Sequence, residues 1–388
     1  MKALIEYFKT KKYLGFILLL ISPNISFSQT NTCIIKGIVM NTNSKELILA
    51  KCRDDLRKSK EIISIVDGKF EHKLSYDQDE PYQLVFKDSY ENAAWRTTVI
   101  FPENGEIQVI LFPDNEFDKN EIKGGDLNKE FSTYYKEREL TFYEPRKKIR
   151  SEHKAIQEKN LSYDSEATKQ LQLKIDSLKS AIYKYESQYI KNSHSTMAYY
   201  ILYRHTFNND KIALHFEDIQ DNYQILSERY PNHPYTSFIG QKLASFNAIK
   251  VGGDFIDFTA PDLEGNPITF SNQLKDKITL LDLWGSWCGP CIRTSRTMIP
   301  IYEFYKEKGF NVIGVAREFK DTNALERTLE REKFPWNNLL ELDDQQQIWL
   351  KYGIPNTGGK TFLIDQEGKI LAISPTADEL TKILEREL

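Results

Sequence analysis

The chain has 388 residues, more than one hydrophobic core usually organises, so two or three domains are expected. Hydrophobic residues make up 40% of the chain and charged residues 28%, a composition that excludes a disordered or collagen-like protein. The formal net charge is −4, and this excess of acid argues against nucleic acid or an anionic membrane surface as the main partner.

Residues 1–28 are typical of a secretory signal peptide. Four lysines precede an apolar run from Leu14 to Ile21, and Ser26-Phe27-Ser28 forms a small-x-small cleavage site. The apolar run is shorter than the ~20 residues that are needed to cross a bilayer, so we expect cleavage and a periplasmic or otherwise exported protein. If the segment were not cleaved, it would anchor the protein to a membrane.

Residues 29–122 are predicted to form a small β-sandwich or barrel. Short β-rich runs follow one another at regular spacing between Ile34 and Phe112. Asp67-Gly68 separates two of them and predicts a tight hairpin, because both positions favour φ > 0. A first hairpin that turns near Asn43 would place Cys33 opposite Cys52. These two residues are therefore candidates for a structural disulfide, and two free thiols are the alternative.

Residues 123–250 are predicted to be helical. Apolar residues at alternating spacings of four and three form a stripe over three heptads, made up of Ala167, Leu171, Ile175, Leu178, Ile182, Tyr185 and Tyr189. Such a stripe must be buried against another helix, so we expect a helical hairpin. Asp164 or Ser165 is the candidate N-cap of the helix.

Residues 251–388 alternate between strand and helix patterns. The run 280–284 is typical of a strand buried on both faces, and Pro290 suits the first turn of a helix that ends near residue 308. Further strands are predicted at 312–316, 361–365 and 369–373, with further helices at 324–333 and at the C-terminus. These elements predict a mixed sheet between helices.

Cys288 and Cys291 fall at the predicted turn from strand to helix. The first helical turn brings the two side chains to one edge, where free N–H groups and the positive end of the helix dipole favour a thiolate. We expect an exposed Cys288 to attack a substrate disulfide and a deeper Cys291 to resolve the mixed disulfide. Zinc would need two more ligands, but residues 251–388 contain no other Cys and no His, so neither a metal nor another cofactor is expected.

The run from Leu281 to Cys291, which ends in Trp287-Cys288-Gly289-Pro290-Cys291, resembles the active-site segment of thioredoxins. Together with Ala260-Pro261-Asp262 and Phe362-Leu363-Ile364-Asp365, it makes residues 251–388 similar to the exported TlpA/ResA-like branch of that superfamily. The resemblance implies an α/β thioredoxin-like domain with thiol-disulfide oxidoreductase activity. The preceding β and helical regions resemble the N-terminal extensions of TlpA-like proteins from Bacteroidetes.

The same resemblance implies partners and roles. Disulfide-containing exported proteins would be the substrates, and a membrane-embedded dithiol would supply electrons. Because Gly289-Pro290 resembles the thioredoxin dipeptide, we expect a reductase, with cytochrome c maturation or periplasmic redox homeostasis as its setting.

The resemblance also implies a role for individual residues of the site. Cys288 matches the attacking thiol and Cys291 the resolving thiol, while Trp287 and Pro290 shape the substrate-binding rim. Asp282 matches the buried acid of thioredoxins, whose pKa is raised by desolvation and which could take the proton from Cys291. A solvated Asp at the end of a strand is the alternative.

Two departures from the family pattern concern the same site. Thr294 stands three residues after the second cysteine, where a Glu is frequent, which leaves Asp282 as the candidate acid. Gly359 stands where thioredoxins place a cis-proline facing the disulfide, and Pro355 lies four residues earlier. Substrate would therefore contact either a displaced Pro355 or a glycine-rich backbone at Gly359.

Two other functions fit parts of the sequence. The N-terminal half could recognise a partner while the cysteine pair only reports redox state. A peroxidase is suggested by Ala260-Pro261-Asp262, but a peroxidatic cysteine normally has Thr or Ser three residues before it, and that position is Gly285.

Overall fold

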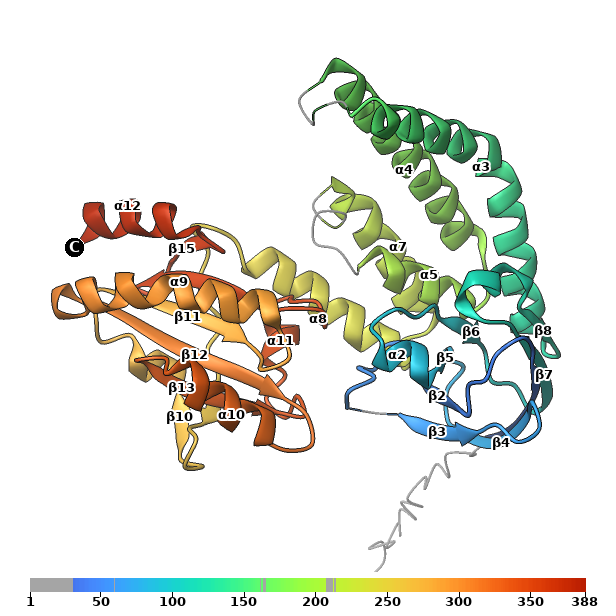
Figure 1. Ribbon diagram of the computed structural model, residues 1–388, viewed down its shortest axis with the longest axis horizontal. Helices are drawn as coiled ribbons and strands as arrows, with labels where there is room; N and C mark the ends of the chain where they lie inside the picture. The colour runs from blue at the N-terminus through green and yellow to red at the C-terminus, as the bar shows by residue number, and fades with distance from the viewer. Residues whose placement is uncertain (1–30, 59, 161, 163–164, 207–211, 213) are drawn as a thin grey trace, which may run out of the picture.

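A computed structural model describes residues 31–388 except 59, 161, 163–164, 207–211 and 213 (Figure 1). The predicted signal peptide, residues 1–28, lies outside this described part of the chain. Among the described helices, none combines the length and the apolar character of a transmembrane segment.

The N-terminal region is the predicted β-sandwich, built from two four-stranded sheets. The first sheet has the order β4 (Lys69–Tyr76), β1 (Asn31–Val39), β7 (Gly105–Leu111) and β8 (Glu121–Lys123). The second has the order β3 (Glu61–Ser64), β2 (Glu46–Lys51), β5 (Tyr82–Phe86) and β6 (Thr98–Ile100), with the short helix α2 (Lys87–Glu91) after β5. Alternating apolar side chains of both sheets, such as Ile35, Leu49 and Val109, form one buried cluster between them.

The turn at Asp67-Gly68 forms as predicted, with φ of 49° and 70° at its two residues. It does not join a two-stranded hairpin, however. Backbone pairing between the two strands is limited to the bridge between Val66 and Lys69, after which β3 pairs with β2 and β4 pairs with β1. The turn therefore carries the chain from one sheet of the sandwich to the other.

The predicted disulfide between Cys33 and Cys52 is wrong, because both thiols are free. β1 pairs with β4 and β7 instead of β2, so the segment around Asn43 changes sheets and does not form a hairpin. As a result, Cys33 lies in the core of the sandwich, whereas Cys52 packs against the apolar cluster of the helical region.

Alkylation of the denatured protein without reductant tests this correction. We expect Cys33 and Cys52 to be labelled, while Cys288 and Cys291 react only after reduction. Peptide mass spectrometry reads the result, and a peptide pair linked through Cys33 and Cys52 would contradict it.

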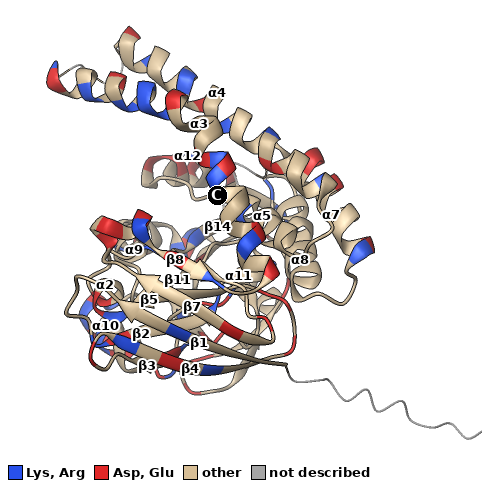
Figure 2. Ribbon diagram, turned by 90° about the vertical axis from the view of Figure 1, so that its right-hand side faces the viewer, with Lys and Arg blue, Asp and Glu red and all other residues tan. Residues whose placement is uncertain are grey.

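The helical region consists of α3 (Asp126–Glu158), α4 (Glu166–Asn192), α5 (Met197–His205), α7 (Phe216–Arg229) and α8 (Pro234–Ala248). α3 and α4 pack as the expected hairpin, and Ser165 caps α4 by accepting a hydrogen bond from the N–H of Thr168. Leu171 of the predicted stripe is buried, while Ala167 at its start is exposed. α3 continues through Pro145 without ending there. Residues of both charges are interspersed along α3 and α4 (Figure 2).

The C-terminal domain has the predicted thioredoxin-like fold. Its five-stranded sheet has the order β13 (Asn337–Leu342), β12 (Phe310–Glu318), β11 (Ile278–Trp284), β14 (Lys360–Asp365) and β15 (Ile370–Ile373). β11, β12 and β13 run parallel, and β14 and β15 form the antiparallel edge. The helices are α9 (Gly289–Tyr305), α10 (Asn323–Glu332), α11 (Ile348–Lys351) and α12 (Ala377–Glu387), and the short strands β9 (Thr259–Pro261) and β10 (Pro267–Thr269) precede the sheet.

β11 is the central strand, and all seven of its residues are buried. Leu280 packs with Met298 of α9 and Leu384 of α12, whereas Leu281 packs on the other face in a cluster that includes Trp349 of α11. Helices cover both faces of this strand, so the place open to a functional site is the edge of the sheet at the carboxyl end of β11, where the cysteine motif begins.

Candidate active site

The cysteine pair lies at the turn between β11 and α9. Cys288 is the N-cap of α9, with Pro290 in the first turn, and its Sγ is bonded to that of Cys291. The backbone N–H of Cys291 points at the Sγ of Cys288 at 3.3 Å. In the reduced protein this N–H and the positive end of the helix dipole would favour a thiolate on Cys288.

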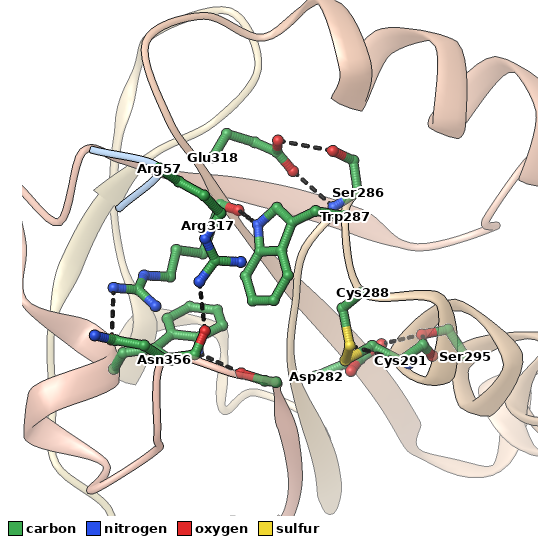
Figure 3. The surroundings of a disulfide bond; sticks show 12 residues. Arg57, Asp282, Ser286, Trp287, Cys288, Cys291, Ser295, Arg317, Glu318 and Asn356 are labelled. Atoms are coloured by element: carbon green, nitrogen blue, oxygen red, sulfur yellow. Dashed lines mark hydrogen bonds between the residues drawn. A yellow bond between two sulfur atoms is a disulfide. The ribbon is translucent and has the colours of Figure 1, made fainter. Parts of the chain in front are cut away.

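The exposure of the two cysteines differs from the expected order. Cys288 is only 5% exposed in the disulfide state, whereas Cys291 is partly exposed and lines a cleft of ≈ 510 Å³. The Cys288 side chain points towards Cys291, to which its Sγ is bonded (Figure 3). The prediction of an exposed Cys288 therefore does not describe this state.

Asp282 is a buried acid, not a solvated residue at the end of a strand. It is 4% exposed, it accepts a hydrogen bond of 2.7 Å from the Oγ of Ser295, and it lines the same cleft as Cys291. Burial raises the pKa of Asp282 to about 6, and the Ser295 hydrogen bond opposes part of that rise. Thr294, at the position of the expected Glu, also lines the cleft.

Ser295 was not predicted as a site residue. Its Oγ also donates to the backbone O of Cys291, four residues earlier in α9, at 3.1 Å. The spacing of four from Cys291 was the available signal, because such residues lie on one face of a helix.

The glycine-rich backbone, and not Pro355, borders the disulfide cleft. Gly359 and Pro290 line this cleft with Cys291. A Cβ atom at Gly359 would lie 1.9 Å from the backbone O of Leu283, so the neighbouring β11 leaves no room for a side chain there. Pro355 instead lines a separate cavity. No described peptide bond is cis.

Trp287 is held from two sides. Its Nε1 donates to the backbone O of Arg317 on β12 at 2.8 Å. The guanidinium of Arg57 lies over the indole ring, 3.6 Å from the ring centroid (Figure 3). Arg57 follows β2 in the sandwich, so the N-terminal region contributes a residue to the rim of the redox motif.

Arg57 is itself fixed by hydrogen bonds. Asp55 accepts from its Nε at 2.9 Å and from its Nη2 at 2.5 Å, and the backbone O of Asn356 also accepts from Nη2. Sequence analysis missed the contact between Arg57 and Trp287. These two residues are 230 positions apart, and nothing in the sequence near either of them indicates the other.

Ser286 is also held by a residue that the sequence did not reveal. Its backbone N–H and its Oγ donate to the two carboxylate oxygens of Glu318, at 2.7 and 2.8 Å. Burial raises the pKa of Glu318. The described residues contain no group of His, Cys, Asp and Glu side chains that could hold a metal ion.

Comparison with known proteins identifies the family of this chain. The model of the AhpC/TSA family matches residues 251–373. The thiol-disulfide oxidoreductase ResA of Bacillus thuringiensis is 32% identical over 139 residues, which are 35% of this chain and 74% of that protein. This chain belongs to the ResA family of thiol-disulfide oxidoreductases.

ResA of Geobacillus thermodenitrificans is likewise 32% identical, over 36% of this chain and 75% of that protein. Among solved structures, the thioredoxin domain of a thiol-disulfide oxidoreductase from Bacteroides vulgatus is 29% identical. It covers 36% of this chain and 97% of that domain, with a TM-score of 0.32. The AhpC/TSA-family match lies in the C-terminal domain, which contains Asp282 and the cysteine pair.

Replacing Asp282 by Asn should change stability in a pH-dependent way. In the folded state the pKa of Asp282 is raised to about 6, whereas its ordinary pKa is 3.8. The folded state therefore keeps this proton to a higher pH than the unfolded state, and the protein loses stability as the pH rises between these two values. Asp282→Asn removes this loss, which amounts to about 3 kcal/mol above pH 7. Urea unfolding at pH 7.5 should show a more stable variant, with an advantage that shrinks towards zero at pH 4. An equal effect at both pH values would contradict this account.

Replacing Arg57 by Ala should free one face of Trp287. A cation over an indole contributes about 0.5–2 kcal/mol, so the ring should become more mobile and more hydrated. We expect a red shift of the tryptophan emission, with a smaller shift for Arg57→Lys, which keeps the charge without the planar stack.

Because the chain has five tryptophans, the control is the same substitution in a Trp287→Phe background. The shift should be absent there. If it persists, it comes from another tryptophan, and the contact between Arg57 and Trp287 does not control the emission.

Proposed function

We propose that this protein is a reductase of disulfides in exported proteins, with Cys288 as the attacking thiol. The observation that carries the proposal is the Cys288–Cys291 disulfide at the start of α9, where the N–H of Cys291 is directed at the Sγ of Cys288. A helix start lowers the pKa of such a thiol and so supplies the nucleophile.

The reaction starts from the reduced pair. The Cys288 thiolate attacks one sulfur of the substrate disulfide, forms a mixed disulfide and releases the other substrate sulfur as a thiolate, which takes a proton from water. Cys291 then gives its proton to Asp282 and attacks the Sγ of Cys288, which expels the second substrate thiolate. Two electrons pass to the substrate, and the enzyme is left with the Cys288–Cys291 disulfide.

The substrate would dock at the cleft that Asp282, Pro290, Cys291 and Gly359 line. An extended substrate segment would pass along the backbone at Gly359, which lines this cleft. A membrane-embedded dithiol would return two electrons to the disulfide. The predicted signal peptide supports action outside the cytoplasm, with cytochrome c maturation or periplasmic redox homeostasis as the setting.

A redox-sensing binding protein is the second candidate. The stacking of Arg57 on Trp287 favours it, because a change at the cysteine pair could be transmitted to the sandwich through this contact. In that case the protein would bind its partner without reducing it.

An insulin reduction assay with dithiothreitol as donor separates the two functions. We expect the wild-type chain to accelerate reduction and Cys288→Ser to abolish the effect. Cys291→Ser should instead accumulate a mixed disulfide on Cys288, which non-reducing gels detect. The matched control is Cys52→Ser, which removes a cysteine away from the motif and should retain activity.

Equal rates for wild type and Cys288→Ser would reject the enzymatic role. Asp282→Asn, assayed alongside, should slow the resolving step above pH 6, where the wild-type carboxylate is ionised. The direction of the reaction is tested by equilibration with glutathione. We expect a potential nearer to the roughly −270 mV of thioredoxin than to the roughly −120 mV of a strong oxidant.

A further inference from the structure

A second cavity, of ≈ 680 Å³, lies away from the disulfide cleft, where three parts of the chain meet. One wall is the segment 53–58 after β2, another comes from α5 and α8, and the third from α11 and the loop to Thr357. The cavity shares no lining residue with the cleft that contains Cys291. The cavity and the disulfide cleft are therefore two separate sites.

Most of the charged side chains that line this cavity already have ion-pair partners. Arg53 pairs with Glu80, Asp55 pairs with Arg57, and Arg317 pairs with Asp344. A ligand would therefore meet an unpaired charge only at a lining cation that lacks such a partner.

Lys242 of α8 is the clearest unpaired cation. It is 6% exposed, and no carboxylate in the described part of the chain comes within ion-pair distance of its Nζ. Burial lowers the pKa of Lys242 to about 8, because the charged form loses water without gaining an anion. Buried charges in proteins are ordinarily paired, so the Nζ of Lys242 lacks the anionic partner that such a group usually has.

Arg317, which also lines the cavity, lacks one hydrogen-bond partner. Its Nε and Nη2 donate to Asp344 at 2.6 and 2.8 Å, but its Nη1 is buried and has no hydrogen-bond acceptor within the described residues. The Oδ2 of Asp55, 3.7 Å away, is too distant for a hydrogen bond. Arg317 is 2% exposed, so bulk water does not readily satisfy the free N–H groups.

The remainder of the lining is largely apolar. Phe238, Trp349, Leu350 and Ile354 provide aromatic and aliphatic surface beside these cations. Ligand sites in proteins typically combine such a surface with a few placed polar groups. The ligand that fits has one anionic group and an apolar body.

We propose that this cavity binds a small organic monocarboxylate with an apolar body, with its carboxylate on Lys242. The site is separate from the thiol-disulfide chemistry and does not require it. Its ligand would contact the sandwich, the helical region and the thioredoxin-like domain together, and so would stabilise their junction.

Titration of the full chain with benzoate tests the site, with benzamide as the neutral probe of the same shape. Benzoate should raise the Tm saturably, and benzamide should not. Lys242→Met should weaken benzoate binding about tenfold or more, as expected for the loss of a charge-assisted hydrogen bond. The matched control Lys250→Met removes an exposed lysine just after α8 and should bind like wild type. Circular dichroism establishes that both variants are folded.

Unchanged benzoate affinity in Lys242→Met, or equal binding of benzamide, would overturn the proposal. A second readout does not need a variant. Acetic anhydride at pH 8 should label Lys242, and benzoate should protect Lys242 but not Lys250. Absence of protection would also overturn it. Cys288→Ser should bind benzoate like wild type, so this site and the redox function are tested separately.

Discussion

The hydrogen bond from the Cys291 N–H to the Cys288 Sγ is the contact on which the chemistry of this protein depends. It exists because the fully buried strand β11 ends at a turn that opens directly into α9. The same strand holds Asp282, and α9 returns Ser295 to bind its carboxylate. One strand, one turn and one helix thus bring together the proposed nucleophile, resolving thiol and proton acceptor.

Charged side chains join the sandwich to this unit. Arg317 ties Asp344 and Asn356 of its own domain together and lies 3.7 Å from Asp55 of the sandwich. Its backbone O also accepts from Trp287, on which Arg57 stacks. Buried polar networks specify one arrangement because each broken contact leaves a costly unpaired group. The junction is therefore specific, and it encloses the second cavity.

The sequence was most informative where a pattern is local. The buried run at 280–284, the Pro290 helix start and the final hairpin all formed as predicted, because burial and turn chemistry act over a few residues. Cys288, Cys291 and Pro290 could be placed from the motif alone, whereas the sequence left open whether Pro355 or Gly359 borders the cleft. The β13 strand was missed, since Asn337 and Asn338 at its start interrupt a β-like pattern.

Contacts over long separations could not be predicted. β1 pairs in parallel with β7, which places Cys33 beside Gly105 and removes the hairpin on which the Cys33–Cys52 disulfide rested. Arg57 reaches Trp287 only because two domains dock. The low exposure of Cys288 likewise depends on tertiary structure. The position at the helix start determines the electrostatic environment of the thiol, but it does not determine how much of the side chain is exposed to solvent.

The central claim is that Cys288, and not the more exposed Cys291, is the nucleophile. Its most direct test is alkylation of the reduced chain with substoichiometric iodoacetamide at pH 7, followed by peptide mass spectrometry. The same reaction in urea, where both thiols are equivalent, gives the reference ratio. If the helix start governs reactivity, the label goes to Cys288 in the folded protein; preferential labelling of Cys291 would contradict the assignment.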